Sequence, residues 1–207
     1  MAPKNKFTRE KMIDAALQVV RAKGIDALTA KALAEELGIS TQPIFTCFGS
    51  MEAVREAVYR EAEQRYDEYE AQILKDPVPF LRFGALYIRF AKKEPELYRL
   101  LFLMQTVDGS NGAFEAMRHS QELVRPSLIN TYHISEEDAD RYFRDLWLVV
   151  HSLATLIVTG SCPYSDEDIG QIMTGFSISI FKAIKEIPGF TKGTFDRDTI
   201  FENMISQ

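Results

Sequence analysis

Histidine and cysteine, the residues most often used for catalysis and metal binding, are few and scattered in this sequence. The three histidines are His119, His133 and His151, and the two cysteines, Cys47 and Cys162, do not form a Cys-x-x-Cys pair. No glycine-rich phosphate loop and no nucleophile elbow occurs. We therefore expect no enzyme activity, no metal and no cofactor.

The nearest approach to a metal-binding pattern is on one face of a predicted helix. Glu115, His119 and Glu122 share that face and could in principle hold a cation. The same spacing is commoner among solvated charged pairs at i,i+4. We interpret these residues as a solvent-exposed charged cluster.

A pattern suited to reading DNA lies between Leu28 and Phe48, which reads as two short helices joined by a tight turn. The second helix leaves a polar and aromatic face pointing outward. Amides, hydroxyls and aromatic rings contact base edges when a helix enters the major groove. The residues predicted on this face are Thr41, Gln42, Phe45 and Thr46.

Other residues in this stretch are expected to position that face. Thr29 can cap the first helix, and Gly38 can end it because glycine tolerates a positive φ. Ser40 is expected to cap the second helix, and Pro43 falls in its first turn, where a missing N–H costs little. Ile44 faces inward as part of a small core.

These elements, in this order, resemble the TetR family of one-component bacterial repressors. The resemblance covers residues 1–60 and is carried by Ala15, Gly24, Thr29, Ala34, Gly38, Ile39, Ser40, Phe48 and Ser50-Met51-Glu52. It implies a homodimer in which each N-terminal domain places its third helix in one half of a palindromic operator. We expect the residues that contact this double-stranded DNA to be Thr29, Lys31, Ser40, Thr41, Gln42, Pro43, Phe45 and Thr46.

Three positions depart from the family pattern. Phe45 stands where the family most often has Tyr, Cys47 where it often has His or Tyr, and Met51 where it usually has Lys. Because phosphate contacts carry most of the nonspecific affinity, we predict weaker and less salt-dependent DNA binding than is typical. The alternative is a dimeric small-molecule-binding protein whose DNA-binding head is weakened or decayed.

Charge is distributed unevenly along the chain. The net charge is −6, yet residues 1–50 contain seven Lys/Arg and five Asp/Glu, a balance of +2 against −8 for the remainder. A basic N-terminal segment on an otherwise acidic chain is compatible with DNA binding.

Features of other protein classes are missing from the sequence. No apolar run is long enough to span a membrane, and the first residues lack the apolar core of a signal peptide. Two cysteines do not make a disulfide framework. We expect a cytoplasmic protein with no membrane partner.

Beyond residue 50 the periodicity predicts helices only, and three residues near the end, Ile200, Phe201 and Met204, could dock as a further short helix. The expected fold is all-α with about nine helices. Residues 1–50 would form a helix-turn-helix DNA-binding domain, and residues 51–207 a helical effector-binding and dimerisation domain. The helical patterns of the second domain cover residues 51–75, 80–93, 95–103, 113–131, 136–159 and 166–187.

Aromatic and sulfur side chains gather on the helices of the second domain. Residues 146–153 look like the Trp-x-x-x-His-Gly element of one TetR subgroup, with Ser152 in place of the glycine. As a group these side chains are enough to line an apolar cavity for a small hydrophobic effector, to which His151 would offer a polar contact. The alternative is that they pack a core in which His151 is hydrogen-bonded. The expected pocket residues are Tyr66, Phe83, Tyr87, Phe90, Tyr98, Phe102, Phe114, Met117, Trp147 and His151.

The last two long helices are more apolar than one subunit requires, which favours a four-helix interface in a homodimer. Residues 146–158 are apolar nearly all round, and this predicts deep burial. The expected interface residues are Leu156, Ile169, Met173, Phe176 and Ile180.

Overall fold

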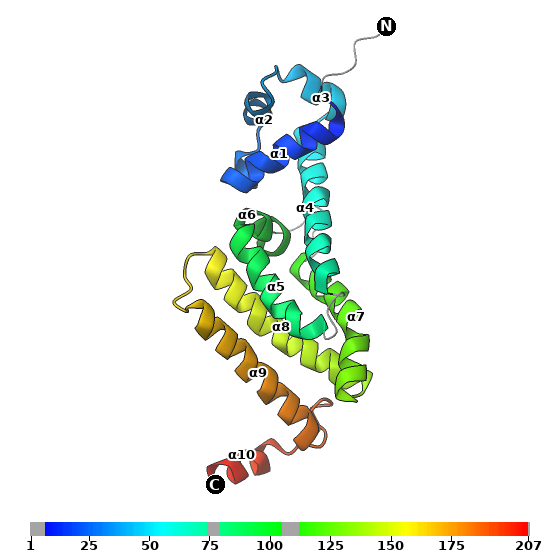
Figure 1. The fold of residues 1–207 in the computed structure, drawn as a ribbon, viewed down its shortest axis with the longest axis vertical. Coiled ribbons are helices and arrows are strands. Elements are labelled where there is room, and N and C mark those ends of the chain that lie inside the picture. Colours follow the sequence, from blue (N-terminus) through cyan, green and yellow to red (C-terminus); the bar gives the residue numbers. More distant parts are fainter. Residues whose placement is uncertain (1–6, 74–78, 105–111, 207) are drawn as a thin grey trace.

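The computed structural model describes residues 7–73, 79–104 and 112–206. Over these ranges the chain is all-α, as expected, and has ten α-helices and no strand. Figure 1 shows a small group of N-terminal helices at one end, a larger group at the other, and the long helix α4 between them. We call residues 7–48 the head and residues 79–186, within the described ranges, the body.

The head contains three α-helices and one 3-10 turn, which enclose a small apolar core. These elements are α1 (Arg9–Lys23), η1 (Ile25–Ala27), α2 (Ala30–Leu37) and α3 (Gln42–Phe48). Apolar residues at helical spacing on each element meet in the middle and are completely buried. They include Ala16, Leu17, Val20, Leu28, Leu33 and Ile44.

The two ends of α2 are as predicted, but the predicted cap of α3 is not present. Thr29 Oγ1 accepts a hydrogen bond from Ala32 N at 3.1 Å, and Gly38 ends α2 with a left-handed φ of 65°. The expected Ser40 cap is wrong, because α3 begins at Gln42 and no side chain caps it. Pro43 explains the difference: it sits where a Ser40 cap would find its third-position N–H, and proline has none.

Helix α4 (Met51–Ile73) links the head to the body. Ser50 Oγ accepts a hydrogen bond from Ala53 N at 3.2 Å and so caps the start of the helix. Its inward stripe is buried at Val54, Val58, Ala62, Tyr66 and Ile73, while Tyr69 is half-buried. An unpredicted member of the stripe is Glu70, which is also buried.

The body is arranged around α8 (Glu136–Val158), which packs against α5 (Pro79–Lys93), α7 (Gly112–Tyr132) and α9 (Asp166–Glu186). The hydroxyls of Ser135 and Ser165 cap α8 and α9, as their acidic first turns predict.

The helix expected over residues 95–103 divides into two parts. The α-helix α6 (Pro95–Tyr98) is followed by a π-helix, η2 (Arg99–Leu103). The wider π turn allows three consecutive side chains, Leu100, Leu101 and Phe102, to be buried together.

Burial of α8 is less complete than the sequence predicts. Leu148 is 53% exposed in the single chain, and Ser152 is exposed one turn later. On α9, Phe176 and Ile178 are exposed as well. The apolar excess of these helices therefore lies partly on the surface of the chain.

The expected interface residues divide between this surface and the interior. Leu156, Met173 and Ile180 are half-buried, whereas Ile169 is only 3% exposed. Ile169 belongs to the core of its own chain, which corrects its assignment to the interface.

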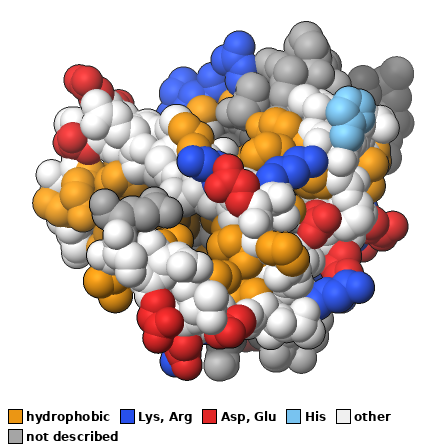
Figure 2. Space-filling model, turned by 90° about the horizontal axis from the view of Figure 1, so that it is seen from below, with side chains coloured by type: hydrophobic (Ala, Val, Ile, Leu, Met, Phe, Trp, Pro, Cys, Tyr) orange, Lys and Arg blue, Asp and Glu red, His pale blue; other side chains and the backbone are white. Residues whose placement is uncertain are grey.

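The C-terminal segment forms a helix, α10 (Arg197–Ile205), but it does not dock as expected. Phe201 and Met204 are exposed because the helix extends away from the body (Figure 1). Figure 2, seen from the end that carries α10, shows surface hydrophobic side chains together with acidic ones. Within the described ranges, none of the helices combines the length and apolarity that a membrane crossing requires.

Candidate nucleic-acid interface and effector region

The outer face of α3 carries the four side chains predicted for base contacts. Thr41, Gln42, Phe45 and Thr46 are all exposed, and Phe45 presents a large apolar ring to solvent. Thr46 Oγ1 donates to Gln42 O at 2.9 Å, which occupies its only hydroxyl proton. The face therefore offers an amide, hydroxyl acceptors and an aromatic ring.

The remaining residues predicted to contact DNA lie at the surface too. Thr29, Lys31 and Ser40 are exposed, and Pro43 is half-buried. Lys31 Nζ is 3.9 Å from Glu35 Oε1, and such an exposed ion pair holds a lysine only weakly. The role of these residues in DNA binding stays a prediction.

The positions that depart from the family pattern differ in their surroundings. Phe45 and Cys47 are exposed, whereas Met51 is half-buried and packs against the core. A cation does approach this end of α3, because the Arg9 guanidinium lies 4.9 Å from the centre of the Phe48 ring.

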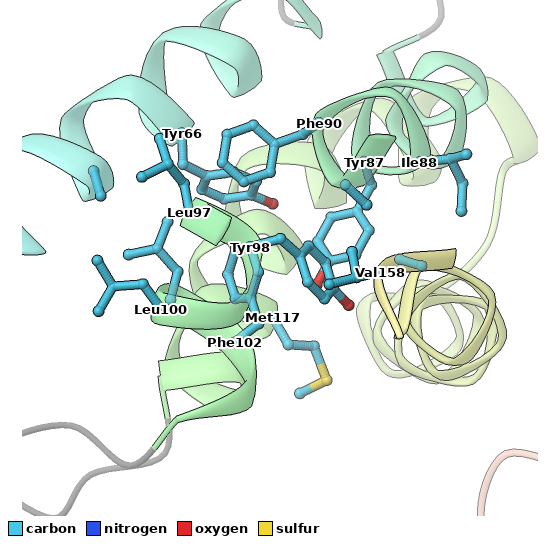
Figure 3. Packing of buried hydrophobic residues seen from close by; sticks show 14 of the residues in the cluster. Tyr66, Tyr87, Ile88, Phe90, Leu97, Tyr98, Leu100, Phe102, Met117 and Val158 are labelled. Carbon is cyan, nitrogen blue, oxygen red and sulfur yellow. The ribbon is translucent and has the colours of Figure 1, made fainter. Parts of the chain in front are cut away.

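Most residues predicted for the effector pocket form one packed aromatic cluster. The Tyr66 ring meets Phe90 at 5.2 Å and Phe102 at 5.0 Å between centroids, both edge to face. Figure 3 shows side chains from several helices converging there. Those predicted residues that are buried are Tyr66, Phe83, Tyr87, Phe90, Tyr98, Phe102, Met117 and Trp147.

A polar side chain, His151, contacts three members of this cluster. His151 Nδ1 is 2.9 Å from the Tyr87 hydroxyl and 3.0 Å from the Tyr98 hydroxyl, and the Trp147 ring stacks on the imidazole at 4.6 Å. Burial lowers the pKa of His151, which keeps the ring neutral at pH 7. His151 is thus a half-buried residue that is hydrogen-bonded to two tyrosines of the cluster.

Two of the expected pocket residues have distinctive surroundings. Trp147 Nε1 is buried and has no hydrogen-bond partner. Since buried donors are nearly always paired, this N–H is available to a further acceptor. Phe114 is 52% exposed and so lies outside the buried cluster.

A narrow crevice lies where α4, α5 and α7 meet, and it has no free interior volume even for a water molecule. Phe83 is the one predicted pocket residue in its wall. The other lining residues are Glu70, Ile73, Ser120, Leu123 and Val124.

The head and the body are joined by a contact that sequence reasoning missed. Arg21 on α1 donates two hydrogen bonds to Glu94, which precedes α6, at 2.7 and 2.6 Å. Beside it Gly24 has a φ of 81°, and a Cβ there would lie 3.0 Å from Glu96 Oε2. Arg21 and Glu94 are 73 residues apart, so no local pattern signals the pair.

Comparison with known proteins supports the same assignment for the head and for the body. The family described as "Bacterial regulatory proteins, tetR family" matches residues 12–58, and "Tetracyclin repressor-like, C-terminal domain" matches residues 80–174. An uncharacterised helix-turn-helix transcriptional regulator of Mycobacterium tuberculosis is 25% identical over 167 residues, covering 79% of this chain and 76% of that protein.

Two further proteins are similar to this chain. The class D tetracycline repressor protein of Escherichia coli is 32% identical over 87 residues, which cover 42% of this chain and only 40% of the repressor. A solved TetR-like transcriptional regulator from Rhodococcus sp. RHA1 has a TM-score of 0.61 at 18% identity, over 82% of this chain and 92% of that one, and supports the fold.

The fold and these matches identify the protein as a transcriptional regulator that binds DNA through a helix-turn-helix. The chain belongs to the TetR family. Regulators of this family bind DNA and effectors, form dimers and are generally not enzymes. Membership of the Trp-x-x-x-His-Gly subgroup stays a prediction.

Proposed function

We propose that this protein is a homodimeric repressor that releases a palindromic operator when a small hydrophobic effector binds the body. The observation that carries the proposal is the joint placement of two features. Helix α3 exposes a polar and aromatic face, and the same head is tied by Arg21 to Glu94, next to the aromatic cluster of the body.

The DNA-binding step would use α3 as a major-groove reader. Gln42 is suited to paired hydrogen bonds with adenine, and Phe45 to contact with a thymine methyl group. Thr29 and Lys31, at the start of α2, are suited to phosphates. Two such heads in a symmetric dimer would read a palindrome.

The effector would be mainly apolar, with one hydrogen-bond acceptor. Aromatic rings surround the candidate site, and the unpaired Trp147 N–H supplies a donor inside it. The narrow crevice beside Phe83 would have to open for a molecule to enter, and this opening would wedge α5 away from α7. Ala substitution of Trp147 should then abolish effector-induced release.

Release would pass through the two links between body and head. Tyr66 on α4 contacts Phe90 and Phe102, so displacing these rings would move α4. Arg21 holds α1 to Glu94, which immediately precedes α6. A shift of either link changes the separation of the two heads and therefore their fit to the operator.

The homodimer would form through α8 and α9, where Leu148, Phe176 and Ile178 are exposed in the single chain. Exposed large apolar side chains on neighbouring helices are typical of an interface. Phe176→Arg should give a monomer in sedimentation experiments. Phe201→Arg on α10 is the matched control and should leave the dimer intact.

The central experiment is a footprint and a salt titration on DNA from upstream of the protein's own gene. We expect the wild type to protect a palindrome. Gln42→Ala should bind this DNA roughly ten- to hundredfold more weakly, which is the range for one lost base contact. Gln64→Ala, an exposed glutamine on α4, is the control and should bind normally.

The second candidate function, a ligand-binding dimer with a decayed head, rests on Phe45, Cys47 and Met51. A folded dimer that binds none of these fragments at any salt concentration would contradict the repressor and favour this alternative.

A further inference from the structure

Helix α4 buries a carboxylate in an otherwise apolar stripe. Glu70 is 3% exposed and lies between α4 and α7. Its Oε1 accepts a hydrogen bond from Ser120 Oγ, while its Oε2 is buried and has no hydrogen-bond partner. An unpaired buried carboxylate oxygen is costly, so it calls for a proton or a cation. Burial accordingly raises the pKa of Glu70.

Two further ligand-type side chains converge on Glu70. Asp67 precedes it by one turn on α4, and His119 comes from α7, next to Ser120. His119 Nε2 lies 3.8 Å from Glu70 Oε2, and one ligand atom from each of the three residues lies within 4.8 Å of the other two. Asp67 and His119 are exposed, so a small ion can enter from solvent and meet Glu70 at the bottom.

We propose that Asp67, Glu70 and His119 bind a divalent first-row transition metal ion. One imidazole nitrogen and two carboxylate oxygens form a donor set that suits zinc and its neighbours, with water in the open position. Ligand bonds to zinc are about 2.0–2.2 Å long, so donors around one ion lie within about 4.4 Å of each other. The observed separations need only small side-chain movements to reach that geometry.

The grouping differs from the charged cluster that the sequence suggests. Glu115 and Glu122 share a face of α7 with His119, but the structure brings His119 to a second helix instead. A site shared by α4 and α7 has a consequence for the fold, because a bound ion cross-links them. The ion would therefore fix the body end of the helix that carries the head.

Binding of the metal does not depend on the proposed repressor function. It is tested by titrating zinc into the full chain after treatment with a chelator, with calorimetry as the readout. We expect one ion per chain and a rise in the unfolding temperature. Glu70→Gln keeps the side-chain shape and removes the charge, and it should weaken binding at least tenfold, the scale of effects for even the outer partners of a metal site.

Matched variants separate this site from nonspecific binding. Glu115→Gln and His133→Asn remove an exposed carboxylate and an exposed imidazole outside the site, and they should bind zinc as the wild type does. His119→Gln alters only an exposed side chain, so it tests the site even if Glu70→Gln were unfolded.

Cobalt gives an independent spectroscopic readout. Its visible spectrum should lack the thiolate bands that Cys47 or Cys162 would produce as ligands, and it should disappear in His119→Gln. Equal zinc affinity in wild type and His119→Gln, or no zinc binding to the wild type, would overturn the proposal.

Discussion

The head and the body place their polar groups in opposite ways. In the head, a fully apolar core leaves hydroxyls and an amide pointing outward from α3. In the body, the imidazole of His151 and the carboxylate of Glu70 lie between helices, in contact with hydroxyl groups. From this difference we expect the head to act through its surface and the body to respond through contacts between its helices. Four experiments test this expectation.

The largest effect is expected from Ile44→Ala. Ile44 is completely buried in a core of few residues, so its truncation should cost about 2–5 kcal/mol and unfold the head before the body. Urea unfolding followed by circular dichroism should then show two steps. Fluorescence of Trp147, the single tryptophan, should follow only the second step. Ile44→Val is the mild control, and a single coincident transition in Ile44→Ala would mean that the two regions unfold together.

Removing one hydroxyl beside His151 should lower the unfolding free energy by less than Ile44→Ala does. The Tyr98 hydroxyl is within hydrogen-bond distance of His151 Nδ1, His151 O and Thr155 Oγ1, and the Tyr87 hydroxyl is within hydrogen-bond distance of His151 Nδ1. We expect Tyr98→Phe to cost about 1–2 kcal/mol of unfolding free energy, more than Tyr87→Phe. Urea titrations monitored through Trp147 measure both. Equal small losses would show that the His151 contacts contribute little.

The link between the two regions should be weaker still. The two-pronged Arg21–Glu94 pair is partly exposed, and its coupling energy should be about 1 kcal/mol in a double-mutant cycle with alanine. The coupling should shrink at high salt because the ions are screened. Strict additivity of the two single variants at low salt would show that the pair does not hold head to body.

The smallest change concerns the weakened phosphate contacts of the head. Met51→Lys should add one phosphate contact and steepen the dependence of log K on log salt by about 0.9. Fluorescence anisotropy with labelled operator DNA measures this slope. Met204→Lys adds the same charge on α10, at the opposite end of the molecule, and should leave the slope unchanged (Figure 1). Identical slopes in the two variants would place Met51 away from the DNA.

Features of the head could be predicted because their causes are local. The Thr29 cap, the Gly38 turn and the inward Ile44 each follow from residues within a few positions of one another. The Ser40 cap was predicted wrongly, although the reason was also local. Pro43 removes the N–H that such a cap would bind.

In the body, the aromatic cluster and a hydrogen-bonded His151 were predicted from composition and spacing, but the partners of the polar contacts were not. The pairing of His151 with Tyr87 and Tyr98, and of Arg21 with Glu94, joins residues more than fifty positions apart. Glu70 did carry a signal, since it stands one turn after Tyr66 and one turn before Ile73 on a buried stripe. A carboxylate at such a position is a reason to search for its partner.

If the exposed leucine and phenylalanine side chains of α8 and α9 form the dimer interface, they set how operator occupancy depends on the concentration of the chain. A palindrome needs two chains, so below the dissociation constant of the dimer its occupancy would rise with the square of the chain concentration. A twofold change in gene dosage would then alter occupancy about fourfold, by mass action alone. Substitutions at Leu148 would shift this threshold without touching the DNA or the effector.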